Sequence, residues 1–173
     1  MMTGIIIISL ISLLFDGVLT NYLPYLINDL TFFTPMFTVI TIFLIYPLFY
    51  KEHKKYLIYT CILGGIYDLF YTNLFLFDTF LFLLLGLITI YIYKTFDVSK
   101  IRVLFHLIFI IALYEILFAL CIKIFNLVPI SIERLIYKIT HSFLLNIIYG
   151  YIIHIIISKV AKKKLNYKIY KTN

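Results

Sequence analysis

The stretch "LGGIYDLFYTNLFLFD", residues 63 to 78, places two carboxylates, Asp68 and Asp78, and a glycine pair in a chain otherwise rich in Ile, Leu, Phe and Tyr. The apolar sequence continues on both sides, from about residue 56 to residue 93. A single helix of about 38 residues would be nearly twice as long as the hydrocarbon core of a membrane requires. We therefore expect two helices joined by a hairpin turn at "YTN", residues 71 to 73.

The composition of the whole chain is typical of an integral membrane protein. Of its 173 residues, 64% are hydrophobic and only 13% are charged, and its mean hydropathy is positive. Soluble domains are far more polar. No stretch is polar and long enough for a separate soluble domain, so we expect one membrane domain over residues 1 to 173. The first apolar run, from Gly4, has no basic residues before it and no cleavage site after it, so we expect a retained helix.

Charged and Pro/Asn-containing stretches divide the chain into six apolar segments. About 20 mostly apolar residues are needed to cross the hydrocarbon core as a helix. The fold class we expect is therefore all-α, a polytopic membrane protein with six transmembrane helices. These predicted spans are residues 4 to 21, 31 to 50, 56 to 73, 75 to 93, 102 to 125 and 135 to 158.

The distribution of Lys and Arg predicts the orientation, because short loops rich in these residues stay on the cytoplasmic side. Twelve of the 15 basic residues lie in "KEHKK" at 51 to 55, in "KTFDVSKIR" at 94 to 102, and in the tail from Lys159. Both termini are therefore expected in the cytoplasm. The net charge of +7 is explained by this topology and does not indicate nucleic-acid binding. The basic tail is also suited to contacting anionic lipid headgroups.

Four of the six predicted spans carry a stripe of polar or small residues at helical spacing. Ionisable groups inside a membrane are costly and usually face the protein interior or a cavity. We therefore expect the four stripes to converge on one interior, an intramembrane polar seam. Its predicted members are Asp16, Gly64, Asp68, Glu115, Lys138, His141 and Asn146.

The seam residues carry individual expectations. Asp68 should point inward to a base or a hydroxyl of another helix, where it either pins the packing or binds a partner. Asp78 lies close to the headgroups and is expected at the solvated surface. Glu115 lies near the middle of its span, so it should be protonated or paired, most simply with Asn146.

No catalytic constellation is visible. "YD" at Tyr67 and Asp68 is half of the signature of intramembrane aspartyl proteases, but the Gly-x-Gly-Asp half is missing. The chain also lacks the serine-hydrolase elbow, the zinc-protease motif and a glycine-rich phosphate loop. No histidine pair has metal-site spacing. We expect no enzyme activity, no cofactor and no metal, which leaves a transporter binding subunit or an interaction protein of a membrane complex.

Several stretches together resemble the rod shape-determining protein MreD family of bacteria. The most specific is Gly64-x-x-x-Asp68, followed by a short turn and a further apolar helix. The others are "SLLFDGVLTNYLP" from Ser12, "IALYEILFAL" from Ile111 and "HSFLLNIIY" from His141.

This resemblance implies a protein of the bacterial cytoplasmic membrane that belongs to the cell-elongation machinery. The partners it implies are MreC, the RodA glycosyltransferase with its transpeptidase partner, and the MreB filament. The family is similar in architecture to the transmembrane substrate-binding subunits of energy-coupling-factor vitamin transporters. The alternative function is therefore a substrate-binding subunit of such a transporter.

Overall fold

The computed structural model describes residues 2–26, 34–49, 52–72, 76–96, 102–124 and 132–171, and the regular structure in these ranges is entirely helical. The elements are α1 (Met2–Leu26), α2 (Phe37–Ile45), the 3₁₀ turn η1 (Tyr46–Phe49), α3 (His53–Tyr67), the π-helical turn η2 (Asp68–Thr72), α4 (Phe77–Thr95), α5 (Arg102–Ile124) and α6 (Ile132–Lys171). The expected all-α class is confirmed.

Four of the described helices are long and apolar enough to cross a membrane. They contain the stretches Thr3–Tyr22, Phe77–Thr95, Val103–Ile124 and Leu135–Ala161. The predicted second span was too long, because its helix begins only at Phe37 and gives Phe37–Phe49 as a shorter apolar helix. Pro35 contributes to this late start, since the residue before a proline disfavours the α conformation and proline itself has no N–H to donate.

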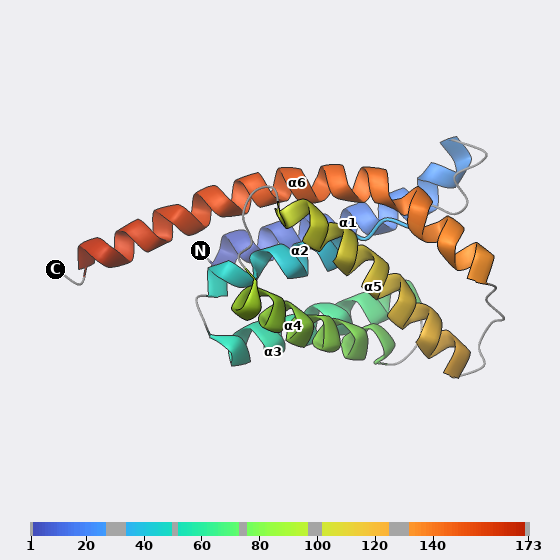
Figure 1. Ribbon diagram of the computed structural model, residues 1–173, viewed down its shortest axis with the longest axis horizontal. Helices are drawn as coiled ribbons and strands as arrows, with labels where there is room; N and C mark the ends of the chain where they lie inside the picture. The colour runs from blue at the N-terminus through green and yellow to red at the C-terminus, as the bar shows by residue number, and fades with distance from the viewer. Residues whose placement is uncertain are drawn as a thin grey trace.

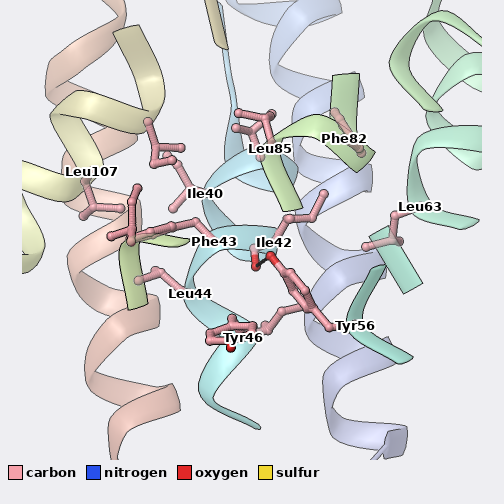
Figure 2. Packing of buried hydrophobic residues seen from close by; sticks show 14 of the residues in the cluster. Ile40, Ile42, Phe43, Leu44, Tyr46, Tyr56, Leu63, Phe82, Leu85 and Leu107 are labelled. Atoms are coloured by element: carbon pink, nitrogen blue, oxygen red, sulfur yellow. Dashed lines mark hydrogen bonds between the residues drawn. The ribbon is translucent and has the colours of Figure 1, made fainter. Parts of the chain in front are cut away.

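Helix α2 lies in the middle of the fold, with α1 and α6 on one side and the α3–α4 pair on the other (Figure 1). All nine of its residues are buried. Figure 2 shows Ile40, Phe43 and Leu44 of α2 packed among side chains of neighbouring helices, including Leu107 of α5 and Leu85 of α4. In a membrane such packing stabilises through van der Waals contact, because lipid tails are as apolar as the core itself.

Helices α3 and α4 form the expected hairpin, and their backbones approach closely at Gly64. A Cβ atom at Gly64 would lie 2.5 Å from Thr79 Cα and 2.8 Å from the Asp78 carbonyl oxygen. Only glycine fits there. The chain enters α4 through Leu76, whose φ of 60° is in the left-handed region that non-glycine residues rarely adopt.

Helix α6 is much longer than the bundle. Its 40 residues extend about 60 Å, twice the thickness of the hydrocarbon core. Figure 1 shows its C-terminal part projecting beyond the other helices, at the end of the bundle where the N-terminus lies. The predicted sixth span, residues 135 to 158, covers only part of this helix and stops 13 residues before its end.

Candidate functional site

Asp16 of α1 holds the beginning of α2. Its carboxylate accepts hydrogen bonds from the backbone N–H groups of Phe37, at 2.7 Å, and Thr38, at 2.9 Å. The first N–H groups of a helix have no partner within the helix, and the helix dipole favours a negative charge at this end. Asp16 is 1% exposed, so a buried carboxylate and buried N–H groups satisfy one another.

Asn146 of α6 fixes the non-helical segment that precedes α2. Its Oδ1 accepts from the Met36 N–H at 2.9 Å, and its Nδ2 donates to the Thr34 carbonyl at 2.9 Å. The Ser142 hydroxyl, one turn earlier on α6, accepts from the Thr34 N–H at 3.1 Å. Asp16 and Asn146, two predicted seam residues, therefore both bind the chain between residues 34 and 38.

Asp68 performs the same task for α4. Its carboxylate accepts from the backbone N–H of Asp78 at 2.7 Å, from the Thr79 N–H at 3.0 Å and from the Thr79 hydroxyl at 2.7 Å. The prediction that Asp68 meets a hydroxyl of another helix is confirmed. Gly64 also lies against Asp78 and Thr79. Two predicted seam residues, Gly64 and Asp68, therefore stabilise the same contact between α3 and α4.

Asp78 is not at the solvated surface, and that prediction was wrong. Its side chain is fully buried and accepts a hydrogen bond from the Tyr114 hydroxyl of α5 at 3.0 Å. Counting residues from the end of the span gave the depth of Asp78 but not the direction in which its side chain points. The carboxylate turns into the bundle, where its Oδ1 accepts from Tyr114.

Glu115 of α5 pairs with Lys138 of α6, and not with Asn146 as the sequence suggested. The Lys138 Nζ lies 3.0 Å from Glu115 Oε2. The Glu115 side chain is 1% exposed and that of Lys138 is 29% exposed. Lys138 also lies over the ring of Phe118, 5.2 Å from its centre. The amide of Asn146 is already used by the segment before α2, and the lysine supplies the charge that an ionised Glu115 needs.

His141 lies outside the seam. Its side chain is on the exposed side of α6, stacked on Tyr137 with ring centres 3.7 Å apart. Its Nδ1 is 2.8 Å from the Tyr137 carbonyl oxygen of the same helix. The histidine follows Thr140, which is also exposed, and precedes Ser142, which is buried. A shift of one residue along a helix turns a side chain by about 100°, enough to move His141 off the inner face.

A cluster of three hydroxyls joins α1, α2 and α6 and was not anticipated from the sequence. The Ser12, Thr41 and Tyr149 hydroxyl oxygens lie 2.6 to 2.8 Å from one another. The Tyr149 ring stacks on Phe37 with centres 4.1 Å apart. Ser12 lies one turn before Asp16, on the same face of α1. The available signal for Tyr149 was its position three residues after Asn146, on the same helix face.

A cavity of about 330 Å³ opens where α1, η2, α5 and the start of α6 meet the segment before α2. We call it the aromatic cavity, because five aromatic side chains contribute to its walls. One lysine and a few neutral polar groups complete the lining. The lining residues are Gly17, Thr20, Asn21, Thr34, Pro35, Tyr67, Phe70, Tyr71, Tyr114, Phe118 and Lys138.

The arrangement is suited to holding the helices together and to binding a partner. Its acidic groups contact other parts of the fold. Asp16 and Asp68 accept from backbone N–H groups, and Glu115 is paired with a lysine. Among the described residues, no group of three or more His, Cys, Asp or Glu side chains is placed to hold a metal ion. The concave surface lined by aromatic side chains is the feature with the character of a binding site.

These features define a polytopic helical membrane protein whose buried polar groups tie helices together. The chain belongs to the MreD family, since the family model for rod shape-determining protein MreD matches residues 1–164. It is therefore a bacterial membrane protein with a role in determining rod shape. No curated protein sequence and no solved structure matches the chain.

Proposed function

We propose that this chain is the membrane docking subunit of the rod-shape machinery, which binds MreC and positions the peptidoglycan synthases beside it. The observation that carries the proposal is the aromatic cavity. Aromatic side chains are enriched in protein interfaces because they bury a large area with few rotatable bonds. Phe70 lines this cavity with 70% of its surface exposed, so it is available to a partner.

The elements around the cavity provide a rigid frame for docking. The segment that contributes Thr34 and Pro35 is tied by Asn146 and Ser142. The Tyr71 hydroxyl donates to the Leu13 carbonyl at 2.7 Å, which fixes η2 against α1. Preformed sites lose less conformational entropy on binding. This rigidity supports a role in positioning partners.

The proposal includes a six-pass topology with both termini in the cytoplasm. Helix α2 with η1 extends about 21 Å, and the three non-helical residues before it add up to about 10 Å. Together they can match the hydrocarbon core of about 30 Å. Irregular backbone is tolerated at that depth when it is buried in protein or lines a cavity, as Thr34 and Pro35 do. In this orientation the aromatic cavity opens to the outside.

Cysteine labelling tests the orientation. In a chain with Cys61→Ala and Cys121→Ala, a cysteine at Glu133, exposed at the start of α6, should react with an impermeant thiol reagent added to intact cells. One at Lys54, exposed at the start of α3, should react only after the cells are opened. The opposite pattern would contradict the proposed topology. The same topology predicts outside labelling at Asn28, Asn73 and Ser131, which lie outside the described residues.

Site-specific photo-crosslinking in living cells tests the docking site. A photo-reactive amino acid at Phe70 should give an adduct with MreC. The control is Phe105 of α5, which is equally exposed at 70% but does not line the cavity, and which should give none. Mass spectrometry of the purified complex should identify MreC. Recovery of an energy-coupling ATPase pair with a bound vitamin would instead support the transporter alternative and refute the docking role.

A further inference from the structure

His141 is a polar side chain on the exposed side of a membrane-length helix. It lies six residues inside the stretch Leu135–Ala161, about 9 Å from its beginning. Polar side chains at such depth usually face the protein interior. Exposure of an imidazole there suggests that the surface is covered by another protein in the membrane.

The hydrogen bonds of His141 through Nδ1 leave Nε2 as the ring nitrogen that needs a hydrogen-bond donor. The Tyr137 carbonyl, 2.8 Å from Nδ1, can only accept a hydrogen bond. Nδ1 therefore carries the proton, and in the neutral ring Nε2 is an acceptor. The contacts of this side chain with described residues are made through Nδ1, to Tyr137 and Thr140, and through the ring face. Hydrocarbon offers no donor to Nε2.

Neighbouring exposed side chains continue this face along α6. Tyr137, His141, Leu144, Ile148 and Tyr151 recur at intervals of four, three, four and three residues, the spacing of one seam of a helix pair. We call this set the His141 face. Leu144 is its most exposed hydrophobic member, at 75%. The spacing fits one further helix lying along α6.

We propose that the His141 face binds a transmembrane helix of another protein, which places a hydrogen-bond donor, such as a hydroxyl or amide N–H, against His141 Nε2. A second copy of this chain fits poorly. A parallel two-fold pair of α6 helices would bring two Nε2 acceptors together without a proton between them. This surface is separate from the aromatic cavity, so the inference does not depend on the docking role proposed there.

Photo-crosslinking from Leu144 tests the proposal in cells that express the full chain. The matched control is Leu87 of α4, which is also exposed, at 52%. We expect a protein adduct from Leu144 and none from Leu87. His141→Phe keeps a ring for stacking on Tyr137 but removes both nitrogens, and it should lower the adduct yield about fivefold, the factor for one interhelical hydrogen bond. His141→Gln retains an acceptor and should keep at least half of the yield.

Each other outcome overturns the proposal. An adduct of doubled mass that contains only this chain would identify a second copy as the occupant. Equal yields from Leu144 and Leu87, or no protein adduct, would mean that lipid covers the face. A Leu144 adduct whose yield is unaffected by His141→Phe would show that the histidine does not contribute to the interface. The Phe70 adduct, recorded in the same variants, verifies folding and separates failure here from failure of the cavity proposal.

Discussion

Asp16 and Asp68 hold the starts of two different helices in the same way. Each carboxylate comes from the preceding helix of the chain and accepts from two successive backbone N–H groups, Phe37 and Thr38 for Asp16, and Asp78 and Thr79 for Asp68. The fold thus repeats one device, a buried acid that caps the next helix. Both acids stabilise the structure only while they can accept both bonds.

Removing either capping carboxylate should destabilise the protein strongly. Asp68→Ala leaves two N–H groups and a hydroxyl without their acceptor, so we expect a loss of roughly 2 to 4 kcal/mol in the free energy of unfolding. Asp68→Asn keeps one acceptor oxygen and should lose less. Unfolding in detergent, followed by circular dichroism, measures the difference. Glu133→Ala, at an exposed position, is the control and should change little; an Asp68→Ala variant as stable as this control would contradict the capping role.

The two neighbouring glycines of α3 provide a matched test of helix approach. Gly64→Ala places a Cβ atom 2.5 Å from Thr79 Cα, so the α3–α4 hairpin must open, at roughly 1 to 3 kcal/mol. Gly65→Ala meets only the Thr79 hydroxyl, at an ordinary 3.6 Å, and should be neutral or slightly stabilising. The melting temperatures of the two variants in detergent compare them directly. Equal melting temperatures would mean that the backbones do not touch at Gly64.

The Glu115–Lys138 pair should behave as a buried ion pair. Lys138→Met leaves a carboxylate that is 1% exposed without its counter-charge, and we expect a loss of roughly 3 kcal/mol. Adding Glu115→Gln to that variant should restore part of the stability, because the unpaired charge is gone. A double-mutant cycle on unfolding free energies measures this coupling. Strictly additive effects would show that the two side chains do not interact.

Depletion of the protein should make rod-shaped host cells round. In the proposed docking role, loss of the protein should leave MreC and the synthases without a fixed position relative to the filament, while septal synthesis continues. Light microscopy of depleted cells, with labelled wall synthesis, gives the readout. Wild-type chain should restore the rods, and a Phe70→Ala, Phe118→Ala variant that is inserted normally should restore them poorly. Depleted cells that keep their width and length would contradict the proposed role.

The hairpin at the centre of the chain was predictable because its length alone ruled out one continuous helix. The inward direction of Asp16, Asp68 and Glu115 was predictable too, since ionisable groups in apolar helices point inward. Apart from the hydroxyl that Asp68 meets, their partners were not predictable. Asp16 and Asp68 bind backbone N–H groups. Every residue except proline carries such a group, so the sequence does not indicate which ones a carboxylate will bind. Asp78 was misplaced because its shallow depth suggested a carboxylate hydrated by water. In the structure the Tyr114 hydroxyl donates a hydrogen bond to it.

Helix α2 was also beyond prediction from hydropathy. Residues 31 to 50 are apolar almost throughout, so their composition does not reveal where a helix begins. Pro35 gave a local hint, but the start at Phe37 depends on Asp16 and Asn146, which come from distant parts of the chain. His141 was expected in the seam with Asn146. It lies five residues before Asn146, about 140° away around the helix, which moves its side chain off the inner face.

The capping bonds of Asp16 and Asp68 also constrain how the chain enters the membrane during synthesis. A helix that carries an unpaired carboxylate is costly to insert, by up to about 3 kcal/mol at the membrane centre. The N–H groups that satisfy Asp16 leave the ribosome 21 residues later, and those for Asp68 leave ten residues later. In the proposed six-pass topology, helix α1 should therefore stay beside the insertion machinery until α2 arrives, and α3 until α4, so that these four helices enter the lipid as two pairs.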